Sequence, residues 1–126
     1  MSYLGLVLLA EEQERFKADF PAVHENESGD HMTVWYAPDD DMMLKLAPYI
    51  GCEFQISVIG YWQDHGNQAV EVVSDFDGRV QNTHPHITIS YSADSEAYKT
   101  NEMLEHRAGN LIHASGTYKA TLQFVP

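Results

Sequence analysis

The order of apolar and polar segments in this chain of 126 residues predicts an α+β fold in one domain covering residues 1–126. Extended stretches and stretches of helical composition follow one another in the approximate order β-α-β-α-β-β-β-α-β. We expect the helices to cover one sheet face and to leave the other free for a functional site. A pattern of His, apolar, Thr, apolar, any residue and Tyr occurs twice, at 31–36 and 86–91. The copies begin 86 minus 31, or 55, residues apart, which suggests two similar lobes that bring one copy each.

Composition and charge restrict the classes of partner. With 44% hydrophobic and 21% charged residues, the chain has the composition of a soluble globular protein. Its 19 acidic and 7 basic residues give a formal net charge of -12, which repels phosphate backbones. We therefore expect no long nucleic acid as a partner, whereas a small nucleotide held by local donors is compatible with the charge.

The cysteine content and the N-terminal segment predict a cytoplasmic protein. The lone Cys52 cannot form an internal disulfide, and a reducing compartment fits this best. The apolar run from Leu4 to Ala10 has no basic flank before it and meets two glutamates after it. This pattern matches neither a signal peptide nor a membrane span, so we expect no membrane partner.

Two strand-helix units are predicted in the first half of the chain. Tyr3 to Ala10 is short and apolar, as in a buried strand, and Glu11 to Phe20 has helical composition. A polar loop then leads to a strand that His31 opens. After that strand, three consecutive aspartates are expected to cap a helix from about Asp41 to Tyr49.

The second half begins with a predicted hairpin formed by Glu53 to Gln63 and Gln68 to Ser74, which are separated by turn residues. His86 to Ser92 is predicted as a strand and Ser95 to Arg107 as a helix. Thr117 to Val125 alternates apolar and polar residues, which is typical of a strand with one buried face. The apolar positions of this last strand are Tyr118, Ala120, Leu122 and Phe124.

Strand parity decides which residues of the repeated pattern face outward. Successive side chains of a strand point to opposite faces, so the two copies should expose the same positions. The outward sets are His31, Thr33 and Trp35 in the first copy and His86, Thr88 and Ser90 in the second. Tyr36 and Tyr91 should then be core residues.

Two His-x-Thr pairs lining a groove from opposite walls have the groups needed to cleave a phosphodiester. One neutral imidazole removes a proton, a protonated imidazole supplies one to the leaving oxygen, and each Thr hydroxyl donates a hydrogen bond to the phosphate. A single His-x-Thr pattern on a strand is typical of an ordinary solvated face. Two copies in phase favour catalysis by His31, Thr33, His86 and Thr88.

The segments His31-Met32-Thr33-Val34 and His86-Ile87-Thr88-Ile89 resemble the two signature tetrapeptides of the 2H phosphoesterase superfamily. The second motif is similar to that of phage anti-CBASS phosphodiesterases and of LigT-like RNA cyclic phosphodiesterases. The resemblance implies a bilobal fold of two pseudo-symmetric antiparallel sheet lobes, with outer helices and a central groove. It also implies metal-independent cleavage of nucleotide phosphodiesters. In anti-CBASS members this reaction opens the cyclic oligonucleotide messengers of a bacterial antiviral defence and so stops the signal.

We therefore expect a phosphodiesterase that acts on cyclic nucleotides or cyclic oligonucleotide second messengers, in the host cell cytoplasm if the chain is phage-encoded. One alternative is a 2',3'-cyclic phosphodiesterase acting on RNA or nucleotides, and another is a non-catalytic nucleotide-binding module. No cofactor is expected. His84-Pro85-His86 has the look of a metal pair, but the strand geometry required of His86 argues against zinc, so we expect no metal site.

Further substrate-binding candidates come from parity and residue type. Trp35 shares the face of His31, and Tyr61 should point into the groove unless Gly60 marks a bulge that inverts the strand. Aromatic rings of this kind stack on nucleobases. The full set is Trp35, Tyr61, Ser90, Lys119 and Tyr3. The sequence leaves open which His is the general acid, which nucleobase the substrate carries, and the oligomeric state.

Overall fold

The computed structural model describes residues 2–106, 110–112 and 114–126 and has an α+β fold. The predicted order of strands and helices is confirmed, with two additional short strands, β2 and β7. The third helix begins at Lys99 rather than Ser95, and its predicted end, Arg107, lies outside the described residues. The elements are β1 (Tyr3–Leu8), α1 (Ala10–Asp19), β2 (Asn26–Glu27), β3 (His31–Tyr36), α2 (Asp40–Leu46), the 3-10 turn η1 (Ala47–Tyr49), β4 (Glu53–Gln63), β5 (Asn67–Ser74), β6 (His86–Tyr91), α3 (Lys99–His106), β7 (Asn110–Ile112) and β8 (Gly116–Val125).

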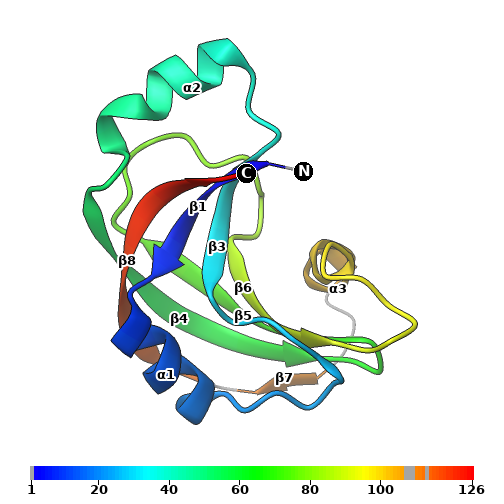
Figure 1. Ribbon diagram of the computed structural model, residues 1–126. Helices are drawn as coiled ribbons and strands as arrows, with labels where there is room; N and C mark the ends of the chain where they lie inside the picture. Colours follow the sequence, from blue (N-terminus) through cyan, green and yellow to red (C-terminus); the bar gives the residue numbers. More distant parts are fainter. Residues whose placement is uncertain (1, 107–109, 113) are drawn as a thin grey trace.

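Six strands form a sheet that closes on itself. They follow the order β6-β3-β1-β8-β4-β5, and β5 pairs back onto β6, all in antiparallel fashion (Figure 1). The short strands β2 and β7 extend this barrel-like sheet beside β6 and β4. The sequence predicts one free sheet face, but closure turns the inner face into the core, so the free strand face is the outer one. The division into two lobes stays a prediction.

The barrel interior is filled by alternating apolar side chains. The strand β8 has the predicted alternation, with three of its four apolar positions fully buried, but Phe124 near its end is 43% exposed. Phe16 of α1 packs edge-on against Tyr118, with 5.2 Å between the ring centroids. Among the residues contributed by β1, β8, β3 and β6 to this core are Leu4, Leu6, Leu8, Tyr118, Ala120, Leu122, Met32, Val34, Ile87 and Ile89.

The helices lie outside the barrel (Figure 1). The aspartates cap α2 as predicted, because Asp39 Oδ1 accepts a hydrogen bond of 2.8 Å from the backbone N–H of Met42. The helix α3 packs against the outer side of β5, where its Met103 and Leu104 form a small cluster with Trp62 and Ala69. This position makes α3 one wall of the candidate site described below. No helix in the described part of the chain is long and apolar enough to cross a membrane.

Candidate active site

The two His-x-Thr motifs lie side by side on neighbouring antiparallel strands. Met32 of β3 pairs with Ile87 of β6, and these are the middle residues of the two motifs. Continuing this register by one residue places His31 opposite Thr88 and Thr33 opposite His86. The middle residues are buried in the core, so the four flanking side chains point outward. The motifs therefore share one surface. The prediction that they face each other from opposite walls of a groove was wrong.

All four predicted catalytic residues line one cavity of about 590 Å³. Tyr3 of β1, also predicted, lies in the same lining. The cavity extends from the outer face of β1, β3 and β6 to the first turn of α3 and the segment before it. The complete lining is Tyr3, Ser28, His31, Thr33, Tyr36, Asn82, His86, Thr88, Ala97, Tyr98 and Asn101.

His86 is the more deeply buried of the two imidazoles, with 9% of its surface exposed. Its Nδ1 lies 2.8 Å from the carbonyl oxygen of His84. A carbonyl oxygen only accepts, so Nδ1 carries the proton and Nε2 keeps its lone pair. Burial lowers the pKa of His86, an effect that the His84 carbonyl opposes and that the neighbouring His31 reinforces. His86 is thus held neutral, with a free basic nitrogen.

His31 is oriented by two partners. Its Nδ1 lies 2.6 Å from Oδ1 of Asp30, and its ring stacks on that of Tyr3 with a centroid distance of 4.7 Å and an angle of 27°. The hydrogen bond from His31 lowers the pKa of the Asp30 carboxyl, which therefore stays ionised at neutral pH. An ionised acceptor requires a proton on Nδ1, so Nε2 is the nitrogen left for a ligand.

The side chain of Thr88 is anchored from α3. Its hydroxyl donates a hydrogen bond of 3.3 Å to Oγ1 of Thr100, which is fully buried. Thr100 in turn accepts a bond of 3.2 Å from Nδ2 of Asn67. The bond made by Thr88 is long and neutral, so a charged phosphate oxygen would compete for its proton favourably.

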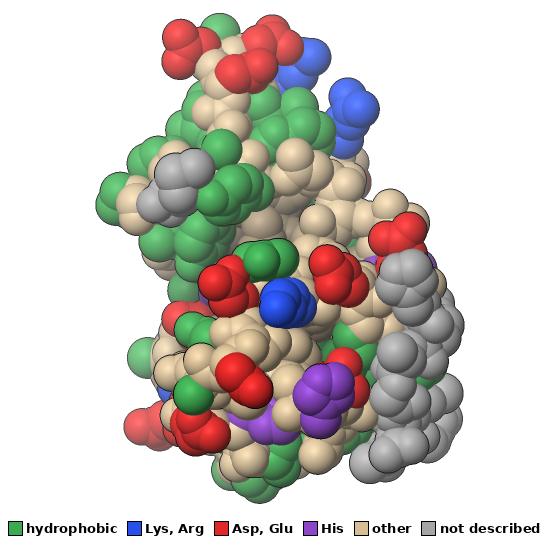
Figure 2. All heavy atoms as spheres, turned by 90° about the vertical axis from the view of Figure 1, so that its right-hand side faces the viewer, with side chains coloured by type: hydrophobic (Ala, Val, Ile, Leu, Met, Phe, Trp, Pro, Cys, Tyr) green, Lys and Arg blue, Asp and Glu red, His purple; other side chains and the backbone are tan. Residues whose placement is uncertain are grey.

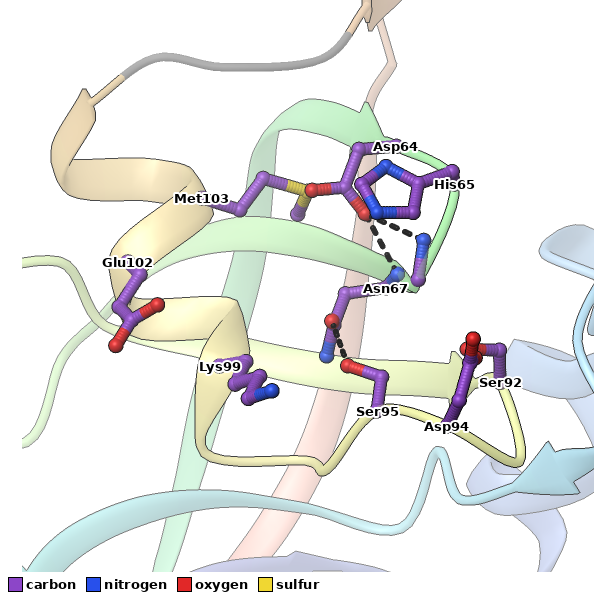
Figure 3. A pocket seen from close by; sticks show the side chains of 10 residues that line it. Asp64, His65, Asn67, Ser92, Asp94, Ser95, Lys99, Glu102 and Met103 are labelled. Carbon is purple, nitrogen blue, oxygen red and sulfur yellow. Dashed lines mark hydrogen bonds between the residues drawn. The ribbon is translucent and has the colours of Figure 1, made fainter.

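A second cavity, of about 330 Å³, lies where the turn between β4 and β5 meets the start of α3 (Figure 3). Asp64 Oδ1 accepts backbone hydrogen bonds from Gly66 and Asn67, and the buried Asn67 side chain accepts from Ser95 and donates to the carbonyl of Glu96. The Asp64 bonds lie within the turn, whereas the Asn67 bonds tie the turn to the segment that carries Tyr98 beside the candidate site. Figure 3 draws the Asp64 bonds and the bond between Ser95 and Asn67. The lining residues of the second cavity are Asp64, His65, Gly66, Asn67, Ser92, Asp94, Ser95, Lys99, Glu102 and Met103.

The strand phase assumed from the sequence is interrupted in β3. Leu4 and Gly5 of β1 pair with Trp35 and Thr33, so Val34 is an extra, bulged residue. Beyond the bulge, Trp35 packs against the barrel core, while Tyr36, expected in the core, is 48% exposed and lines the cavity. The bulge at Val34 explains why the prediction for Tyr36 was wrong. It also explains why Trp35 lies outside the cavity. Tyr91, the other expected core tyrosine, is half-buried.

Three other predicted substrate-binding residues lie outside the cavity. The bulge suggested by Gly60 is present, so Tyr61 packs against the barrel core and its hydroxyl accepts a bond of 2.7 Å from Nε2 of Gln68. Ser90 is fully buried and donates to Oε1 of the same Gln68. Lys119 is exposed on β8, which contributes nothing to the cavity.

Several cavity residues were missed by sequence reasoning. Asn82 comes from the loop before β6, and Tyr98 and Asn101 come from the start of α3 and the segment before it. These segments have no strand periodicity that would assign a face to their side chains. Asp30 was missed as well, and it does not line the cavity but binds His31; its signal is an acidic residue directly before the first motif histidine.

The surface beside the candidate site matches the acidic composition. On the face that bears α3, acidic side chains are spread widely and basic ones are few (Figure 2). Within residues 2–106, 110–112 and 114–126, no group of three or more His, Cys, Asp or Glu side chains is arranged to hold a metal ion.

Acidification is expected to weaken the fold through His86. Its pKa is lowered in the folded state, so below the ordinary His pKa of about 6.5 the unfolded chain binds the proton more readily. The contribution of neutral His86 to the free energy of unfolding is complete above about pH 6.5. It is lost as the pH falls toward the lowered pKa of His86 in the folded state. Urea unfolding at about pH 7.5 and about pH 5.5 should show a larger loss of unfolding free energy in wild type than in His86→Gln. An equal loss in both proteins would contradict this role.

Comparison with known proteins gives no family for the chain: no protein-family model and no curated protein matches it.

Proposed function

We propose that this chain is a 2H-type phosphodiesterase that hydrolyses a cyclic nucleotide or a cyclic oligonucleotide second messenger by acid-base catalysis at His31 and His86. The observation that carries the proposal is the pairing of Met32 with Ile87, which brings both His-x-Thr motifs into one cavity. The antiparallel register relates the motifs by a local two-fold axis, and this supports the proposed bilobal 2H arrangement. The proposed role is anti-CBASS-like immune evasion in the cytoplasm of the host cell.

The environments of the two histidines support different roles in this reaction. Neutral His86, with a free Nε2, acts as the general base that takes a proton from the attacking water. His31, held by the Asp30 carboxylate, acts in its protonated form as the general acid. As the water oxygen bonds to phosphorus, the bond from phosphorus to the leaving oxygen breaks and His31 protonates that oxygen. The hydroxyls of Thr33 and Thr88 donate to the non-bridging oxygens.

The cavity favours a small nucleotide. Its volume of about 590 Å³ falls in the range of small-ligand sites. Tyr36 and Tyr98, which are 48% and 60% exposed, offer rings for stacking, and Asn82 and Asn101 offer amide groups that hydrogen-bond base edges. The net charge of -12 argues against a long polyanionic substrate.

Incubation with a panel of cyclic nucleotides in EDTA tests the proposal. The panel contains cyclic dinucleotides, cyclic trinucleotides and 2',3'-cyclic AMP, with products separated by chromatography. Wild type is expected to open at least one 3',5' linkage, whereas His31→Ala and His86→Ala should each leave the substrate intact. Turnover of 2',3'-cyclic AMP alone would favour the RNA-end type of enzyme. Calorimetric binding of a nucleotide that is recovered unchanged would favour a binding module, and activity persisting in both variants would refute the proposed catalytic pair.

A further inference from the structure

Tyr3 reaches His31 across a position that has no side chain. Tyr3 and Gly5 both face outward on β1, and the backbone partners of Tyr3 and His31 are Tyr36 and Val7, at opposite ends of the paired segment. Their rings nevertheless stack at a centroid distance of 4.7 Å. The Tyr3 ring must therefore lie along the strand, over Gly5.

The space over Gly5 is filled by the Tyr3 ring itself. A Cβ atom at Gly5 would lie 2.9 Å from Cε2 and 3.2 Å from Cδ2 of Tyr3, whereas its distance of 3.5 Å from the carbonyl oxygen of Met32 is an ordinary contact. The first distance is too short for a carbon-carbon contact, so the ring would have to move. Gly5 is not among the described glycines with positive φ, which are Gly29, Gly51 and Gly116. The missing side chain, and not an unusual backbone conformation, is what this position supplies.

We propose that Gly5 is a positioning residue that seats the Tyr3 ring against His31 and so fixes the imidazole of the acid; this rests on the proposed function. A half-buried histidine can rotate about two side-chain bonds. The hydrogen bond to Asp30 fixes Nδ1, and the Tyr3 ring covers one face of the imidazole, so that Nε2 keeps one direction toward the cavity. Any side chain at position 5 displaces Tyr3 and releases His31.

NMR spectroscopy of the ligand-free protein tests, independently of turnover, whether Gly5 allows the Tyr3 ring to stack on His31. The ring protons of His31 should show an upfield ring-current shift in wild type and in Tyr3→Phe. This shift should be lost in Gly5→Ala and in Tyr3→Leu, while amide resonances far from β1 stay unchanged. An unchanged His31 shift in Gly5→Ala would overturn the proposal. If Gly5→Ala does not fold, the other two variants decide, since equal His31 shifts in Tyr3→Leu and wild type would overturn it as well.

Kinetics add a second readout. Gly5→Ala is expected to lower kcat about tenfold with a smaller change in KM, because a misplaced acid weakens the transition state more than substrate binding. In a Tyr3→Leu background the same substitution should have no further effect, since the ring it displaces is already gone. Additive effects would overturn the proposal. If wild type turns over no nucleotide, the proposed function fails, and the NMR result still decides whether Gly5 seats Tyr3.

Discussion

Replacing His86 with Ala is expected to slow hydrolysis of the preferred cyclic nucleotide by about 10²- to 10⁴-fold, the usual contribution of a general base. The loss should appear in kcat, because the imidazole acts on the attacking water and not on the bound bases. The matched control is His65→Ala, which removes an exposed imidazole that lies in the other cavity. Its kcat should stay within about twofold of wild type, since exposed positions away from the site tolerate substitution.

A substrate with a good leaving group separates the two histidines. A p-nitrophenyl phosphodiester of a nucleoside releases a phenolate that needs little protonation, so the acid contributes less to its cleavage. His31→Ala should therefore be impaired much less on this substrate than on the cyclic nucleotide. His86→Ala should be impaired on both, because each reaction still needs the base. The opposite ranking would exchange the two roles.

Replacing Leu122 with Ala is expected to lower the free energy of unfolding by about 2 to 5 kcal/mol. Leu122 lies on β8 with no exposed surface and packs in the barrel core. Truncating it removes apolar contacts and leaves a cavity that a closed sheet cannot easily collapse to fill. Urea unfolding at pH 7.5 or thereabouts measures the change.

Phe124→Ala provides the matched control on the same strand. Its ring keeps 43% of its surface exposed, so the loss should be about 1 kcal/mol or less despite the larger side chain. Leu122 and Phe124 belong to one apolar alternation in the sequence, and that pattern alone assigns them equal burial. Equal destabilisation by the two substitutions would mean that the end of β8 is buried and the barrel extends further than described.

Local periodicity was enough to predict the main elements and the outward direction of His31, Thr33, His86 and Thr88. It failed where a single extra residue changes the strand phase. The bulge at Val34 exchanges the faces of Trp35 and Tyr36, and the one beside Gly60 turns Tyr61 inward. A bulge depends on the partner strand, so alternation within one strand does not reveal where it occurs.

The pairing of strands that are not joined by a short turn could not be predicted from the sequence pattern either. The contact of β5 with β6 closes the sheet, but these strands are joined by the segment 75–85, whose course has no periodic signal. The same segment brings Asn82 to the cavity, and the approach to α3 brings Tyr98. Such residues are placed by hydrogen bonds like those of Asn67 to Ser95 and Glu96, which join distant parts of the chain.

The Met32–Ile87 pair also bears on how the proposed enzyme would prepare for reaction. The separation of the two imidazoles is determined within one sheet, by the hydrogen-bond ladder and by two apolar side chains anchored in the barrel interior. Such a catalytic pair is preorganised, and no domain closure is needed to assemble it. Motions that accompany turnover would then be confined to the wall formed by Tyr98 and Asn101, where they govern entry and release of the nucleotide and leave the acid and base in place.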